Sequence, residues 1–138
     1  MAKAFNPQIH RVIDANFNRA KEGLRVCEDI CRFVYGDASL TRRFKNVRHA
    51  MTAILLKMNT SFLVRARNIQ QDIGKSSIQR ELKRKNVQDI MYANIQRAKE
   101  SIRVLEEFTK LLNQKTAVAL KLLRYKIYAL EQDIIKKG

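Results

Sequence analysis

The chain is poor in the residues that form tight turns and cross-links. Its 138 residues include 4 glycines, 1 proline, 2 cysteines and no tryptophan. So few turn residues exclude a β-sandwich or barrel of many short strands. The apolar runs are far too short to span a membrane, and no apolar segment of the kind found in signal peptides follows Met1. We therefore expect a single domain over residues 1–138, located in the cytoplasm.

Acidic residues are also scarce. Asp and Glu total 13 against 28 Lys and Arg, which gives a formal net charge of +15. Apolar residues make up 46% of the chain, which is too many for a disordered basic tail. The charge predicts an anionic partner, and by itself it leaves open a polymer, a membrane surface or a small phosphate.

Apolar residues instead recur every three or four positions, which predicts an all-α fold. Asn6 and Pro7 form an N-cap followed by a first-turn proline, and Gly36 is suited to a helix end. The pattern predicts long helices over residues 9–35, 40–64, 86–112 and 115–137. A loop and a short basic helix ending at Lys85 are expected to fill residues 67–85. The apolar positions assigned to the core include Phe17, Leu24, Cys27, Phe33, Val34, Leu111 and Leu122.

An internal repeat relates the two halves. Residues 14–34 align with residues 92–112, and nine of these 21 positions are identical. After a two-residue gap, residues 44–49 match residues 120–125. The charge divides evenly, because 13 basic and 5 acidic residues in the first 69 positions give +8, while 15 and 8 in the rest give +7. We predict a helical bundle of two pseudo-repeated αα-hairpins, 6–66 and 86–138, plus the short connecting helix.

The two copies differ at apolar positions and agree at polar ones. Helix geometry places Asn16 on the apolar arc and Arg19 and Glu22 at its edge. Arg25, Glu28 and their copies are expected on a solvated face. Two interpretations stay open for the inward polar residues: a structural hydrogen-bond network, or an anion site with Arg and Asn as donors. The identical pairs are Asn16/Asn94, Arg19/Arg97, Lys21/Lys99, Glu22/Glu100, Arg25/Arg103 and Glu28/Glu106.

Small residues and cysteines in the repeat carry further expectations. Gly23 pairs with Ser101, and a small side chain there admits the close approach of another helix, a ligand or a loop. Cys27 and Cys31 lie on one helix face, but the second copy has Leu105 and Thr109 at these positions. We therefore expect a reduced cysteine pair in the core rather than a metal site at the repeat axis.

One segment between the halves has a phosphate-binding character. Gly74, Lys75 and Ser76 resemble the end of a P-loop, but the earlier glycine and the preceding strand are missing. A Gly-containing turn before a helix, with a lysine beside it, is suited to a phosphate. Asp72 is the best-placed single carboxylate for Mg²⁺. An ordinary helix cap explains the same residues.

The repeat motifs resemble a known family. Residues 15–29 and 93–107 look like its two long signatures, and residues 40–49 and 123–125 look like two shorter ones. The sequence is similar to the α-helical hydroxymethylpyrimidine-phosphate kinase domain that usually precedes thiamine-phosphate synthase in fused proteins. The resemblance implies transfer of a phosphoryl group from ATP, with Mg²⁺, to 4-amino-5-hydroxymethyl-2-methylpyrimidine phosphate. It also implies a separate thiamine-phosphate synthase as a partner, and a homo-oligomer is compatible with it.

That reaction assigns expected roles to the repeated residues. The attacking phosphate oxygen is already ionised, so the site needs cations and positioning rather than a general base. Arg19 and Arg97, with Glu22 and Glu100, are the expected catalytic residues. The expected metal ligand is Asp72, and the expected substrate-binding and phosphate-binding residues are Asn16, Asn94, Arg48, Arg124 and Lys75.

Three further classes of function are compatible with the sequence. The charge of +15 and the basic segment Arg80 to Lys85 suit a nucleic-acid-binding protein. The low aromatic content of 7% and the lack of a recognised motif count against nucleic acid, and a membrane partner is not expected. The second class is an all-α enzyme of the chorismate mutase kind, and the third is a non-catalytic partner of a thiamine-phosphate synthase.

Overall fold

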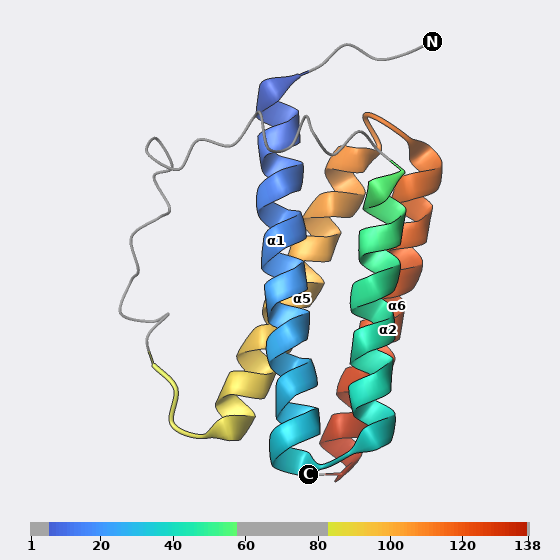
Figure 1. The fold of residues 1–138 in the computed structure, drawn as a ribbon. Helices are drawn as coiled ribbons and strands as arrows, with labels where there is room; N and C mark the ends of the chain where they lie inside the picture. Colours follow the sequence, from blue (N-terminus) through green and yellow to red (C-terminus); the bar gives the residue numbers. More distant parts are fainter. Residues whose placement is uncertain (1–5, 58–82, 138) are drawn as a thin grey trace.

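The computed structural model describes residues 6–57 and 83–137, and both ranges are mainly helical (Figure 1). No strand occurs within these ranges, so the expected all-α class is confirmed for them. None of their helices is long and apolar enough to cross a membrane. The elements are α1 (Pro7–Asp29), the π-helical turn η1 (Ile30–Tyr35), α2 (Ala38–Leu56), α5 (Val87–Thr109) and α6 (Gln114–Lys137).

Local capping residues set the ends of the first helices as the sequence predicts. The Asn6 side chain accepts hydrogen bonds from the backbone N–H groups of Gln8 and Ile9, and Pro7 is the first helical residue. Gly36 ends the helical run with φ 62°, a left-handed conformation that glycine adopts without strain. Asp37 then caps α2 by accepting the N–H of Leu40 at 2.9 Å.

The four long helices surround one apolar core. Helix α1 packs on α2 and α5 packs on α6, while α1 with α5 and α2 with α6 join these two pairs. In Figure 1, α5 crosses behind α1 at a slant. A Cβ atom added at Gly23 would lie 2.9 Å from the carbonyl oxygen of Asn94, which explains the small residue there as a point of close approach between α1 and α5. A two-fold relation between the hairpins remains a prediction from the sequence repeat.

The π-helical turn after α1 is the main departure from the expected core. Phe33 and Val34 are 70% and 58% exposed, although helical spacing assigns both to the core. A π turn adds a residue to each turn, so the side chains after Ile30 rotate out of the α-helical register. Leu111 is also exposed because α5 ends at Thr109, before the predicted end at residue 112. Leu122 lies on the outer face of α6 at 61% exposure.

Two predicted boundaries also differ. Helix α2 ends at Leu56, and the remainder of the prediction to residue 64 lies outside the described residues. Residues 83–85 are not helical, so the short basic helix does not extend to Lys85. Asn86 caps α5 in an extended conformation by accepting the N–H of Asp89, which requires a non-helical chain just before it. The rest of that predicted helix and its loop lie outside the described residues.

Both cysteines are buried and unbridged, as expected of a core pair. The Cys27 thiol faces the carbonyl oxygen of Met91 at 3.9 Å, across the α1–α5 contact. Burial, with a contribution from nearby Asp37, raises the pKa of Cys31 to about 11. Burial also raises the pKa of Cys27 strongly, so both thiols stay protonated near neutral pH.

Candidate functional site

Two buried ion pairs occupy corresponding positions of the sequence repeat. Arg48 of α2 donates from Nε to Glu28 Oε1 at 3.0 Å and from Nη2 to Oε2 at 3.4 Å. Arg124 of α6 makes the same two-pronged contact with Glu106, with Nη2 3.1 Å from Oε1 and Nε bonded to Oε2. The hydrogen bond to Glu106 raises the pKa of Arg124 above its usual value.

These pairs correct the expectation that Glu28 and Glu106 face solvent. The two residues are 5% and 3% exposed, because α2 covers the first and α6 covers the second. Arg25 and Arg103, by contrast, keep more than half of their side-chain surface exposed, as predicted. The repeat did contain the signal for the pairs, since the carboxylate and the arginine are identical in both copies.

In the first half, each residue of the ion pair lines a hollow. A hollow of about 320 Å³ is lined by Asn18, Lys21, Glu22, Arg25 and Arg48. A second hollow of about 550 Å³ has Glu28 in its wall. The two hollows share no lining residue, but the Glu28–Arg48 ion pair links the wall of one to the wall of the other. The other residues lining the larger hollow are Arg32, Gly36, Asp37, Ala38, Thr41, Arg42 and Lys45.

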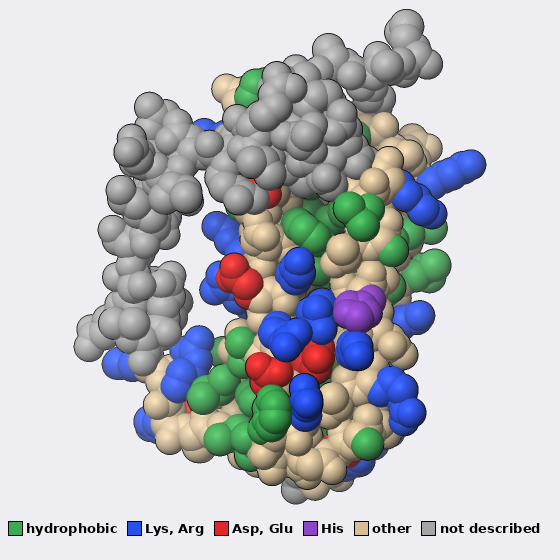
Figure 2. Space-filling model, in the orientation of Figure 1, with side chains coloured by type: hydrophobic (Ala, Val, Ile, Leu, Met, Phe, Trp, Pro, Cys, Tyr) green, Lys and Arg blue, Asp and Glu red, His purple; other side chains and the backbone are tan. Residues whose placement is uncertain are grey.

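We call these two hollows together the basic groove. Six of its lining side chains are Lys or Arg and three are Asp or Glu, which leaves a net charge of +3 in a narrow region. Figure 2 shows Lys and Arg side chains gathered over the face formed by α1 and α2, with carboxylates among them. A concave surface with excess positive charge concentrates anions and favours phosphate groups.

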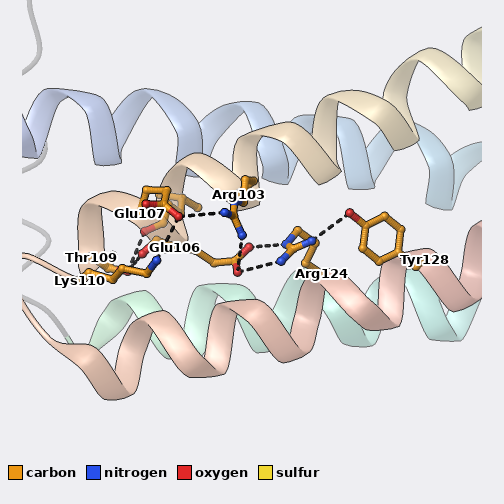
Figure 3. A network of polar contacts seen from close by, with 8 residues as sticks. Arg103, Glu106, Glu107, Thr109, Lys110, Arg124 and Tyr128 are labelled. Carbon is orange, nitrogen blue, oxygen red and sulfur yellow. Dashed lines mark hydrogen bonds and ion pairs between the residues drawn. The ribbon is translucent and has the colours of Figure 1, made fainter.

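In the second half the corresponding cations are bonded to neighbouring side chains, and Figure 3 shows the contacts of Arg103 and Arg124. Arg124 also donates to the hydroxyl of Tyr128 at 2.9 Å. Lys99, the copy of Lys21, donates to Glu131 at 2.9 Å and lies over the Tyr128 ring. Arg103, the copy of Arg25, pairs with Glu107 at 3.1 Å.

Two of these contacts recur in the first half, where Arg48 is bonded to Glu28 and Arg25 lies 3.5 Å from Asp29, but the partners of Lys99 have no counterpart there. Continuing the register of the repeat along α2 places Thr52 and Leu55 where α6 has Tyr128 and Glu131. Lys21 lies 5.6 Å from the centre of the Phe17 ring, and within the described ranges it forms no ion pair. Lys21 is therefore the repeated cation that is available to a ligand, whereas its copy Lys99 is paired.

The side chains of the inward asparagines donate hydrogen bonds to backbone carbonyl groups of their own helices. Asn16 is buried and donates to the carbonyl oxygen of Val12 at 2.8 Å. Asn94 is half-buried and donates to the carbonyl oxygen of Ile90 at the same distance. The inward orientation predicted for Asn16 is confirmed. The amide groups hold helical carbonyls, which supports the structural interpretation of this pair.

The structure brings some of the remaining predicted site residues together in pairs and leaves Glu100 apart from them. Arg19 is exposed and donates to Asn16 Oδ1 at 3.4 Å. Arg97 extends from α5 to within 3.8 Å of Glu22, at the edge of the basic groove. Glu100 accepts a hydrogen bond from Gln96 at 3.0 Å. Asp72 and Lys75 lie outside the described residues.

The carboxylates of the described residues are spread out. No group of three His, Cys, Asp or Glu residues among them is arranged to hold an ion. Glu22 is the one carboxylate in the wall of the smaller hollow. The role of Asp72 as the ligand of Mg²⁺ stays a prediction, because Asp72 lies outside the described residues.

Three cations that line the groove are not predicted as site residues from the sequence. Lys21 belongs to the repeat, but nothing in the sequence marks it as a site residue, and the same is true of Arg42 and Lys45. Residue identity alone does not distinguish Lys21 from Lys99. The two lysines differ in what the neighbouring helix brings to them: α6 supplies Glu131 to Lys99, whereas Lys21 lines a hollow beside α2.

Comparisons with known proteins cover nearly the whole chain. Residues 11–133 match the model of the ThiD2 family. Proteins called thiamine-phosphate synthase are similar in Nostoc punctiforme (37% identical over 128 residues, 92% of this chain and 35% of that protein) and in Synechocystis (37% over 136 residues, 98% and 38%). The thiamine-phosphate synthase of Rhodopirellula baltica is 32% identical over 135 residues, which cover 97% of this chain and 36% of that protein.

The chain thus spans little more than a third of the length of these relatives. No solved structure matches it. The family model covers most of the two hairpins, including both buried ion pairs and nearly all of the basic groove. The chain belongs to the ThiD2 family.

Proposed function

We propose that the protein transfers a phosphoryl group from ATP to hydroxymethylpyrimidine phosphate, forming the diphosphate used in thiamine biosynthesis. The observation that carries this proposal is the basic groove, in which the Glu28–Arg48 pair links the walls of two hollows. Such a groove can hold two phosphorylated molecules side by side. Membership of the ThiD2 family and the name of the relatives support a role in thiamine biosynthesis.

The chemistry suits a groove that offers cations. An oxygen of the pyrimidine phosphate attacks the γ-phosphorus of ATP, the bond from that phosphorus to the β,γ-bridging oxygen breaks, and ADP leaves with the electron pair. Both reactants are anions, so the protein must neutralise their charge and hold them in line. Mg²⁺ bound to the nucleotide supplies further charge neutralisation.

The residues of the groove divide these tasks. Lys21 and Arg48 stand in the wall of the smaller hollow, where they bind the acceptor phosphate. Glu28 fixes the Arg48 guanidinium by a two-pronged hydrogen bond, which orients its remaining N–H groups without loss of side-chain entropy on binding. Arg97 beside Glu22 can close over the open edge. The roles expected of Arg19, Glu100 and Asn94 remain predictions.

The direct test is release of ADP by the pure protein. Mg-ATP and the pyrimidine monophosphate are supplied together, and formation of the diphosphate is followed by phosphorus NMR. We expect turnover that requires both substrates. ADP release at the background rate, with intact folded protein, would show that the chain is not this kinase.

A non-catalytic role beside a synthase is the second candidate. It is favoured by the length of the relatives, which extend well beyond the segment that this chain matches. A complex between the chain and a separate thiamine-phosphate synthase, with no phosphoryl transfer by the chain alone, is the result that this candidate predicts. Size-exclusion chromatography of the mixture tests it.

A further inference from the structure

A third hollow lies where four elements meet at one end of the bundle. It has a volume of about 350 Å³, within the range of roughly 300–1,000 Å³ that is typical of small-molecule sites. Residues from η1 and α2, from the first two turns of α5 and from the end of α6 converge there. We call it the tyrosine hollow, and its lining residues are Tyr35, Asp37, Leu40, Gln88, Tyr92, Ile134 and Lys137.

The walls of this hollow suit a flat ring. Tyr35 and Tyr92 are 41% and 40% exposed, so much of each ring remains free to contact a ligand. Leu40 and Ile134 are buried and contribute apolar surface. Gln88 is exposed and carries an amide that can both donate and accept hydrogen bonds at the edge of a heterocycle.

The π-helical turn accounts for the position of Tyr35. The turn displaces the residues after Ile30 from the α-helical register, and the left-handed Gly36 then turns the chain toward α2. Pi-helical turns often occur at functional sites because they redirect side chains at a cost in helix stability. Here the redirected side chain is an aromatic ring at the mouth of a hollow.

The tyrosine hollow adjoins the basic groove. Asp37 lines both the tyrosine hollow and the larger hollow of the groove, so one residue forms their shared wall. Lys137 pairs with Asp37 at this junction and is itself 60% exposed at its side chain. From Tyr35 to Lys21 the helical run covers about 20 Å at roughly 1.5 Å per residue, long enough for an extended nucleotide and a second phosphate.

We propose that the tyrosine hollow binds the base of the nucleotide that serves as phosphoryl donor. The base stacks against Tyr35 and Tyr92, and the polyphosphate passes Lys137 into the larger hollow beside Arg42 and Lys45. The γ-phosphate then lies near Arg48, at the border of the smaller hollow that receives the acceptor. This assignment rests on the proposed kinase function for the identity of the ligand.

Binding measurements on the full chain test the assignment without relying on turnover. The variants are Tyr35→Leu and Tyr92→Leu, which remove the aromatic ring and keep an apolar side chain. The ligands, studied by isothermal titration calorimetry, are Mg-ATP and inorganic tripolyphosphate, which has no base. We expect each variant to weaken ATP binding about ten-fold, because a stacked base loses its aromatic partner, and to leave tripolyphosphate binding unchanged.

Tyr125→Leu is the matched control, because Tyr125 is an exposed tyrosine of α6 outside the tyrosine hollow. ATP affinity equal to that of the native protein in both hollow variants would overturn the assignment. So would an equal loss of affinity for tripolyphosphate. Tyrosine-dependent ATP binding without phosphoryl transfer would uphold the hollow and refute the kinase function, whereas turnover with tyrosine-independent ATP binding would do the reverse.

Discussion

At the residue scale, each hairpin holds one carboxylate and one guanidinium away from water. Moving such a pair out of water is expensive, and only a close two-pronged contact compensates for it. Glu28 with Arg48 and Glu106 with Arg124 both have this geometry. Loss of one partner therefore leaves an uncompensated buried charge, which is worse than never having buried the pair.

Replacing Glu106 with glutamine tests this cost. Glu106 is only 3% exposed, and Glu106→Gln leaves the buried guanidinium of Arg124 without its counter-charge. We expect the free energy of unfolding to fall by about 3 kcal/mol, as measured by urea denaturation followed by circular dichroism. Glu107→Gln is the matched control, since Glu107 is the neighbouring exposed carboxylate and its ion pairs are screened by solvent, so its loss should change stability far less. Equal effects of the two variants would contradict a structural role for the buried pair.

The two cysteines give a prediction about alkaline pH. Burial raises the pKa of Cys27, and it raises that of Cys31 to about 11, so the folded protein disfavours both thiolates. The thiols ionise in the unfolded chain near pH 9, and stability should therefore be unaffected below that pH and decline above it. We expect slow reaction of both thiols with Ellman's reagent at pH 8 and fast reaction in denaturant. Rapid labelling of the native protein would show that the thiols are accessible.

Residue-level prediction succeeds where position on a helix decides the outcome. Asn16 lies inward as its place on the apolar arc predicts. The same reasoning places Glu28 and Glu106 toward solvent, and it is wrong because a helical wheel does not include the neighbouring helix. Burial of these residues depends on an arginine from α2 or α6, about twenty positions away in the chain.

At the scale of elements, the contact between α1 and α5 depends on one missing side chain. A Cβ at Gly23 would lie 2.9 Å from a backbone oxygen of α5, so the two helices cannot stay at this distance with a larger residue. The helices would have to separate, which disturbs the packing of the core residues around them.

Gly23→Ala measures this contact. Alanine favours an isolated helix by about 1 kcal/mol over glycine, but overpacking a close contact costs about 1–3 kcal/mol. We expect a net loss of stability of about 1–2 kcal/mol, seen as a lower thermal midpoint. Ser101→Ala, at the corresponding position of α5, adds no volume and should change stability by less than about 1 kcal/mol. A gain of stability in Gly23→Ala would refute the close approach.

The ends of the elements were predictable to different degrees. Asn6, Pro7, Gly36 and Asp37 act through local hydrogen bonds and backbone conformation, so the sequence contains the whole signal. The π-helical turn is different, because nothing in the spacing of its residues distinguishes it from α-helix. Its consequence, an exposed Phe33, emerged only in the structure.

At the scale of the whole molecule, the charge of +15 divides almost equally between the two halves of the sequence, but the repeated cations of the two halves differ in their partners. In the second hairpin, Lys99 is bonded to Glu131 and Arg124 is bonded to Tyr128. In the first hairpin, Lys21 lies beside a hollow. The near-equal charges of the halves are evident from the sequence. The difference between them is not, because it depends on which residues α2 and α6 bring to equivalent sites.

The open groove predicts a strong effect of salt on ligand binding. It carries six cationic side chains, and its attraction for phosphates is screened over about 10 Å at 0.1 M salt. We expect the affinity for tripolyphosphate to fall several-fold between about 50 and 300 mM sodium chloride, whereas the thermal midpoint of the free protein changes little. Calorimetric titration at both salt concentrations measures the effect. An affinity independent of salt would contradict binding in the groove.

The central claim is that the groove of α1 and α2, and not its copy on α5 and α6, binds the phosphates. Its most direct test compares Lys21→Gln with Lys99→Gln in the coupled ADP-release assay, at a temperature where both variants are folded. We predict that Lys21→Gln lowers kcat/KM by roughly 10- to 100-fold, which corresponds to the loss of a charged hydrogen bond. The kcat/KM of Lys99→Gln should stay within about two-fold of that of the native protein. Lys99→Gln should be less stable, because it loses the pair with Glu131. Equal losses in the two variants, or a loss in Lys99→Gln alone, would contradict the claim.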